Sequence, residues 1–184
     1  MNTNLQPSGS AYFITKPTAE SERHTLSVLV DNEPGILARI AGLFSARGFN
    51  IDSLTVSETN HEKGRSRITV VTVARPKVLT QIKLQLERLI PVHKVHDLTQ
   101  EGKCLERELA LVKVAGKGEN RVETLRLADA FRAQVVDAST GSFIFEITGK
   151  SSKIEQFIAL MVPLGLVEVV RTGVSAISRG SDKM

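Results

Sequence analysis

Apolar and polar residues alternate where the regular part of the chain begins. From His24 to Val30, the apolar residues at 26, 28 and 30 share one face, which is typical of a half-buried strand. Residues 31–35 then combine possible helix N-caps with a proline suited to a first turn. Apolar residues follow at helical spacing: Ile36, Leu37, Ile40, Leu43 and Phe44. The pattern predicts a strand and then a helix that runs to about Arg47, where Gly48 stops it.

Two more strands and a second helix complete this first unit. Strand-like runs at 50–58 and 67–74 flank the polar stretch 59–66, which suits a hairpin connection. An amphipathic helix is predicted over 78–90 and a short strand over 92–98. The predicted order is therefore β-α-β-β-α-β.

The same order recurs in the second half of the chain. Strands are predicted over 109–115, 135–136, 143–147 and 167–170. The two helices are marked by the apolar residues Val122, Leu125 and Ala128, and by Ile154, Phe157, Ile158 and Met161. Ser152 and Glu155 have capping-box spacing, which predicts where the second of these helices begins. Two copies of one topology predict two small domains.

The repeats define an α+β fold made of two ferredoxin-like βαββαβ modules. Right-handed crossovers put both helices of a module on one face of a four-stranded antiparallel sheet. We predict a flexible tail at 1–22, for which a partner-docking segment is the alternative. A first domain follows at 23–98, then a linker at 99–106 and a second domain at 107–180. The linker is placed where polar residues interrupt the apolar pattern.

The sheet face opposite the helices is left open in this arrangement. In the first domain it would carry Leu29, Val71 and Val73, which are too apolar to remain in water over a wide area. We therefore expect the domains to pair or the chain to associate with itself.

Composition narrows the possible functions. Aromatic residues make up only 4% of the chain and strand 67–74 has none, which argues against stacking of nucleobases. The net charge is +4 from 24 basic and 20 acidic residues, a mixed balance that predicts no nucleic-acid partner. A single cysteine excludes an internal disulfide, and no apolar run approaches the roughly 18 residues of a membrane span. We expect a cytoplasmic protein with no membrane partner.

Residues that could carry catalysis or bind a metal are scattered. The histidines at 24, 61, 93 and 96 stand beside no nucleophile in a recognisable motif, and His93 and His96 would point to opposite faces of a strand. Cys104 has basic neighbours, but neither a resolving cysteine nor a paired histidine motif accompanies it. The sequence predicts no catalytic residue, no metal site and no cofactor.

The loop after the first strand is the best candidate for ligand binding. Residues 32–36 present backbone N–H groups at a helix N-terminus, and Gly35 has no side chain to block a ligand. A carboxylate would suit this position, and an ordinary capped turn is the alternative. The matching turn of the second domain, 116–118, is only a weak dinucleotide motif because Arg121 occupies the place of its third glycine.

Two blocks of sequence carry a family resemblance. The run from Thr25 to Ile40 resembles the opening of an ACT domain, and the run from Gly42 to Val56 closely resembles the small, regulatory subunit of acetolactate synthase (acetohydroxyacid synthase). The second domain agrees at Arg107 to Val114 and at Arg171 to Gly180. The similarity covers His24 to Gly180. It is specific because two distinct motif-rich blocks occur here in the same order as in that family.

This resemblance implies a protein without an active site of its own. Small subunits of this family bind a large, thiamine-diphosphate-dependent catalytic subunit, raise its activity and confer feedback inhibition by valine or another branched-chain amino acid. The reaction joins two pyruvates into acetolactate with loss of CO₂, early in branched-chain amino-acid biosynthesis. The implied partners are the catalytic subunit, an amino-acid effector and a second copy of the chain, paired through the ACT domain.

The resemblance also implies where the effector binds. In such ACT domains it lies at a dimer interface, between the first loop of one chain and the first helix-to-strand region of its neighbour. The matching residues here are Asn32, Gly35, Ile36, Leu37, Asn50 and Ile51. Backbone N–H groups would hold the carboxylate, the amide oxygen of Asn32 or Asn50 the ammonium, and Ile36 or Ile51 an apolar wall.

Two other functions remain open from the sequence. One is a free-standing ACT protein that senses an amino acid and regulates a different enzyme. The other is a small-molecule enzyme on a ferredoxin-like scaffold.

Overall fold

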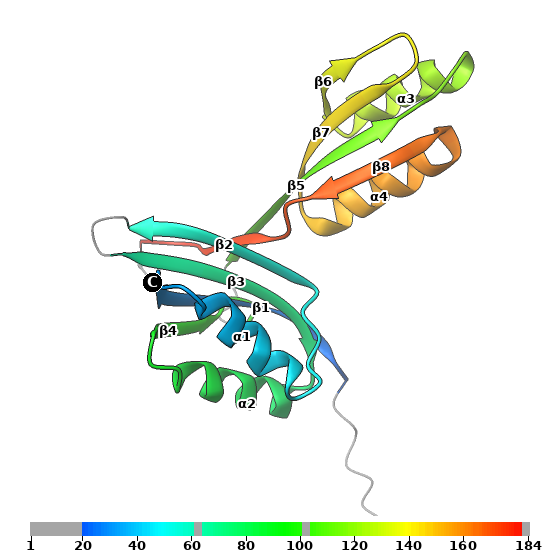
Figure 1. Cartoon of the computed structure of the whole chain (residues 1–184). Helices are drawn as coiled ribbons and strands as arrows, with labels where there is room; N and C mark the ends of the chain where they lie inside the picture. Colours follow the sequence, from blue (N-terminus) through cyan, green and yellow to red (C-terminus); the bar gives the residue numbers. More distant parts are fainter. Residues whose placement is uncertain (1–19, 61–63, 101–103, 182–184) are drawn as a thin grey trace, which may run out of the picture.

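A computed structural model describes residues 20–60, 64–100 and 104–181 of the chain (Figure 1). The predicted tail at 1–22 lies outside the described residues up to position 19, and the first strand already begins at Glu22. Residues 61–63 of the predicted hairpin and 101–103 of the predicted linker also lie outside them. Each half of the described chain folds as a βαββαβ module.

The first module has the predicted topology. Its elements are β1 (Glu22–Asp31), α1 (Ile36–Ser45), β2 (Ser53–Asn60), β3 (Arg65–Ala74), α2 (Pro76–Glu87) and β4 (Val92–Asp97). The strands form one antiparallel sheet in the order β2-β3-β1-β4, so β2 and β4 are its edges. Both helices cover the same face of this sheet (Figure 1).

The second module repeats this arrangement and adds one strand. Its elements are β5 (Cys104–Val114), α3 (Glu119–Ala130), β6 (Gln134–Ala138), β7 (Phe143–Gly149), α4 (Ser151–Met161), a short 3₁₀ turn (Val162–Leu164), β8 (Leu166–Arg171) and β9 (Ser175–Ser178). The main sheet has the order β6-β7-β5-β8, and β9 pairs with the first part of β5. Figure 1 shows β5 running from one module into the other.

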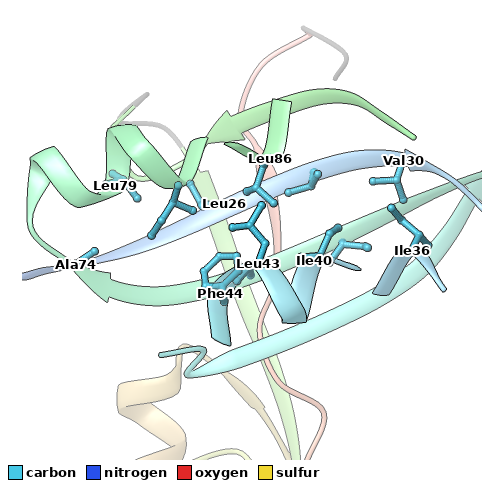
Figure 2. Packing of buried hydrophobic residues seen from close by; sticks show 13 residues of the cluster. Leu26, Val30, Ile36, Ile40, Leu43, Phe44, Ala74, Leu79 and Leu86 are labelled. Atoms are coloured by element: carbon cyan, nitrogen blue, oxygen red, sulfur yellow. The ribbon is translucent and has the colours of Figure 1, made fainter. Parts of the chain in front are cut away.

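The core of the first module lies between its sheet and its helices (Figure 2). Leu26, Val28 and Val30 of β1 are fully buried, as the alternating pattern predicts. They pack against the apolar stripe of α1, where Ile40 and Phe44 are also fully buried. A separate cluster fills the second module between β5, β7 and α4.

The predicted linker at 99–106 is too long, because Cys104 to Glu106 belong to β5. Their backbones pair with β9, in register from Cys104 with Ser178 to Arg107 with Ser175. Neither segment is predicted from the sequence, because the charged residues at 106 and 107 hide the strand pattern of β5. Its partner strand β9 lies about 70 residues away along the chain.

The predicted apolar stripe of α3 is only partly correct. Ala128 is buried, but Val122 and Leu125 are 52% and 40% exposed. Thr124 is buried instead, and its hydroxyl donates to the carbonyl oxygen of Asn120 one turn earlier. A threonine that satisfies its hydroxyl in this way can face a core, so apolar spacing alone misplaced the buried face.

Two predictions at helix ends are wrong. The helix predicted over 78–90 ends at Glu87, and Ile90 is 97% exposed. The capping box at Ser152 does not form, since α4 has no side-chain cap. The neighbouring Ser151 hydroxyl instead donates to Glu108 at 2.9 Å.

The open face of the first sheet is covered in part by the chain itself. Val71 is buried in a cluster with Leu98, Val174 and Ala176, the last two from the segment around β9. Val73, further along the same face, remains 47% exposed. The expected pairing of the domains therefore occurs through the C-terminal segment.

Candidate effector site

The loop between β1 and α1 has an open backbone at Gly35, in a conformation that suits glycine. This residue caps α1 with φ at 87°, in the left-handed region that favours glycine. A Cβ built on it would meet nothing within 4 Å. The position therefore has room for a ligand to approach the backbone closely.

Several amides at this helix start are free to bind an anion. The N–H groups of Gly35, Leu37 and Ala38 donate to no backbone acceptor in the part of the chain that the structure describes. The positive end of the helix dipole lies at the same place, since α1 begins at Ile36. Together they favour a carboxylate.

The start of the loop is held from two sides. The Asp31 carboxylate lies 2.6 Å from Nε2 of His93, and the Asp31 amide donates to the carbonyl oxygen of Pro91 at 2.9 Å. On the other side, the Asn32 amide donates to the carbonyl oxygen of Gly64 at 2.6 Å. His93 therefore supports the loop, a role that sequence analysis missed because the two partners are 62 residues apart.

The side chains after Gly35 point in different directions. Ile36 is only 6% exposed and belongs to the core of the first module, so its side chain does not form the apolar wall of a surface site. Of the two isoleucines named for this wall, Ile51 is therefore the one that stays a candidate. Leu37 is 41% exposed and is the apolar side chain that the helix start offers to a ligand.

The second group of predicted residues precedes β2. The Asn50 side-chain amide donates to Oδ1 of Asp52 at 2.5 Å, which orients the side chain. The Asn50 carbonyl accepts from Oγ1 of Thr72 at 2.6 Å, and the Asp52 amide donates to Val71 at 2.8 Å. Ile51 is partly buried against the core. These bonds attach the segment to β3 and leave the Asn50 amide oxygen available as an acceptor among the described residues.

One chain does not bring the two groups together. Asn32, Gly35 and Leu37 lie at the start of α1, whereas Asn50 and Ile51 follow its end. The helix has 10 residues, so the groups are about 15 Å apart along its axis. Each chain thus holds two halves of a possible site, at opposite ends of one helix.

The histidines and acidic residues form no metal centre in the described part of the chain, where no group of three potential ligands occurs. His24 is buried beside Asp97, with Nδ1 3.3 Å from Oδ2, while His61 lies outside the described residues. Every helix among the described residues is too short or too polar to cross a membrane.

One charged pair in the second module has a clear structural role. Glu108 is 5% exposed and accepts from Nε and Nη2 of Arg171 at 2.6 and 2.8 Å. These hydrogen bonds hold the pKa of Glu108 below its usual value, against the opposing effect of burial. They also raise the pKa of Arg171. The pair joins β5 to β8 beside the start of α4.

Fold and sequence together define an ACT-domain regulatory protein: residues 26–94 match the family model "AHAS small subunit-like ACT domain". Residues 107–180 match the family model "Small subunit of acetolactate synthase". The chain belongs to the acetolactate synthase small subunit family, the regulatory subunits of that enzyme.

Individual relatives agree over nearly their full length. A probable acetolactate synthase small subunit from Archaeoglobus fulgidus is 47% identical over 161 residues, which is 88% of this chain and 99% of the relative. The small subunit of Mycolicibacterium smegmatis is 44% identical, over 85% of this chain and 91% of its own. The crystal structure of the Thermotoga maritima small subunit superimposes with a TM-score of 0.79 at 38% identity, over 88% and 99% of the two chains.

Proposed function

We propose that this chain binds the thiamine-diphosphate-dependent large subunit of acetolactate synthase, raises its activity and makes it sensitive to valine or another branched-chain amino acid. The chain itself is non-catalytic in this proposal and needs no cofactor or metal. The observation that carries it is the open helix start at Gly35, with free amides, in a chain of this family.

The effector's carboxylate would bind at the start of α1. The amides of Gly35, Leu37 and Ala38 supply donors, and the helix dipole adds favourable potential. The bonds from Asp31 and Asn32 to their neighbours hold the loop in this shape before a ligand arrives. Such preorganisation lowers the entropy cost of binding.

The other end of the effector would bind at the segment before β2. Asn50 offers its amide oxygen to the ammonium group, with the Asp52 carboxylate close by. Leu37, which is exposed, and Ile51, which is partly buried, are the aliphatic side chains available for the effector's own side chain. A small aliphatic amino acid fits this combination of groups.

A homodimer would bring the two halves together. β2 is an edge strand, and no strand of the described chain pairs with its outer side. Antiparallel pairing of two β2 strands about a two-fold axis extends the sheet and runs the two α1 helices in opposite directions. The start of one α1 then lies toward the end of the other, where Asn50 follows.

The decisive experiment mixes the purified chain with the catalytic subunit from the same organism. We expect a higher rate of acetolactate formation and inhibition of that rate by valine, leucine or isoleucine. An unchanged rate without amino-acid sensitivity would overturn the proposal. Binding of valine by the chain without any effect on the enzyme would point to the alternative, a free-standing ACT sensor for another enzyme.

A further inference from the structure

The segment between β8 and β9 is hydrogen bonded to the edge strand of the first module. The Val174 amide donates to Oγ of Ser53 at 2.8 Å, and the Val174 carbonyl accepts from Oγ1 of Thr55 at 2.9 Å. Two hydroxyl groups of β2 thus hold both backbone groups of one residue. Figure 1 shows this segment, in red, crossing from β8 to the sheet of the first module.

Gly173 makes this close contact possible. Its φ is 83°, and a Cβ built on it would lie 2.7 Å from Oγ of Ser53 and 3.2 Å from Oγ1 of Thr55. Any other residue would strain the backbone and push the segment away from β2. The side chain of Val174 is 3% exposed and packs on Val71, so apolar burial supports the same contact.

The contact begins directly beside one half of the candidate effector site. Ser53 is two residues after Ile51, and the intervening Asp52 amide donates to Val71. Val71 in turn packs on Val174. The segment before β2 is therefore connected to Val174 both along the strand and through the buried cluster.

The contact continues into the sheet of the second module. Two residues before Val174, the Thr172 amide donates to the carbonyl oxygen of Leu109 at 3.0 Å, and the Leu109 amide donates to Oγ1 of Thr172 at 3.2 Å. Leu109 lies in the part of β5 that pairs with β7. Hydrogen bonds thus connect β2 to the main sheet of the second module.

A second contact between the modules lies away from the effector half-site. Glu106 accepts from Nη1 of Arg23 at 3.0 Å and from the hydroxyl of Thr25. Both partners belong to β1, whose end carries the other half of the site, about ten residues further on. This contact fixes β5 to β1, whereas the two bonds to Val174 attach the C-terminal segment to β2.

We propose that Ser53 and Thr55 are positioning residues that transmit effector occupancy at Asn50 and Ile51 to the second module through the backbone of Val174. This inference rests on the proposed function and adds to it the residues that couple binding to regulation. If the coupling runs through these two bonds, removing them separates effector binding from its consequence for the catalytic subunit.

The test uses the full chain with the double substitution Ser53→Ala and Thr55→Val, reconstituted with the catalytic subunit. Ser53→Ala removes one hydroxyl and Thr55→Val replaces the other with a methyl group of similar size, so both changes keep the shape of β2. We expect the valine Kd from calorimetry to change less than about threefold, while maximal inhibition by valine falls by at least about half. Activation without valine should stay within about twofold of the unsubstituted chain.

Two further variants control the experiment. Ser57→Ala changes the same face of β2, where the described residues show no hydrogen bond to the C-terminal segment, and it should leave inhibition unchanged. Gly173→Ala disrupts the same contact from the C-terminal segment instead of from β2, and it should weaken inhibition as the double variant does. If the double variant is unfolded at the assay temperature, Ser53→Ala alone is judged by the same criteria.

The possible outcomes are distinct. Full inhibition in the folded double variant overturns the inference, and so does loss of valine binding, because the hydroxyls would then act within the site. Loss of activation without valine also overturns it, since the contact would serve assembly. If the unsubstituted chain neither binds an amino acid nor affects the enzyme, the proposed function fails instead.

Discussion

Gly35 combines three properties that suit close approach of a ligand to the backbone. Its φ is positive, its surroundings are open, and its amide lacks a backbone acceptor among the described residues. Gly35→Asp would place a carboxylate where the effector's own should bind, and the two negative charges would repel. We expect loss of valine inhibition with activation of the catalytic subunit retained, measured in the reconstituted enzyme.

A matched variant separates charge from backbone strain. Asn has nearly the shape of Asp, and both residues tolerate positive φ better than most. Gly35→Asn should therefore retain measurable valine inhibition at raised valine concentration. Equal inhibition in the Asp and Asn variants would contradict a carboxylate site at this loop.

Glu108 gives the second module a defined dependence on pH. The pKa of Glu108 is lowered in the folded chain from its ordinary value of 4.5. Its ion pair with Arg171 therefore stabilises the folded state in full at pH values above 4.5, and this stabilisation is lost as the pH falls below 4.5. We expect Glu108→Gln to cost about 1–3 kcal/mol at pH 7 and to flatten the loss of stability below about pH 4.5. Urea unfolding at several pH values measures both effects.

A surface pair serves as the control for this prediction. Glu168 also has a lowered pKa, through its hydrogen bond from Lys113, but its side chain is 57% exposed. Solvent screens such pairs, so Glu168→Gln should change neither the stability at neutral pH nor its pH dependence measurably. An equal loss in both variants would show that burial of Glu108 is not the cause.

Residues of the candidate site were predictable only where the local sequence or the family resemblance marks them. Gly35 follows from its position at a helix start, and Asn50 and Ile51 from the family resemblance. The bond between His93 and Asp31, and the hydroxyls that hold Val174, depend on strand register. Spacing does not tell whether the first apolar residue of a helix faces the core or the surface. Ile36 and Ile51 are therefore equal alternatives for the wall in the sequence, and the burial of Ile36 favours Ile51.

At the scale of elements, the buried face of α3 differs between the prediction from apolar spacing and the structure, and two substitutions can decide between them. Ala128 is 2% exposed under the sheet, whereas Val122 is 52% exposed. We expect Ala128→Leu to overpack the core and cost about 1–3 kcal/mol. Val122→Gln should stay within about 0.5 kcal/mol of the unsubstituted chain. Unfolding monitored by circular dichroism measures the free energy of unfolding of both variants. A larger loss of stability for Val122→Gln would support the buried face that apolar spacing predicts.

Element order was predictable because each element buries one face against its own module. Alternation in β1 and the stripe of α1 are local consequences of that burial. The first four residues of β5 pair with β9 across about 70 residues. Glu106 and Arg107 interrupt the apolar pattern of β5, and β9 has only four residues, so no local period marks either segment. Val174 and Ala176, from the segment around β9, cover part of the open face of the first sheet. A second chain is therefore not needed to bury that part.

At the scale of the whole molecule, the separation of the two half-sites predicts a site shared between chains. In a two-fold dimer each site takes Gly35 from one chain and Asn50 from the other. Gly35→Asp damages the first contribution and Asn50→Ala the second, so a homodimer of either variant has no intact site. A mixed dimer of the two combines both intact contributions at one of its sites and both defects at the other.

Co-expression of the two variants with different affinity tags, followed by purification on both, isolates the mixed dimer. Calorimetry with valine should then find about half as many sites per chain as in the unsubstituted dimer, with similar affinity, while each variant alone shows none. A site contained in a single chain cannot be restored by mixing, since every chain still carries one defect. Absence of binding in the mixed dimer would therefore contradict the shared site, and failure to recover any doubly tagged dimer would contradict the homodimer itself.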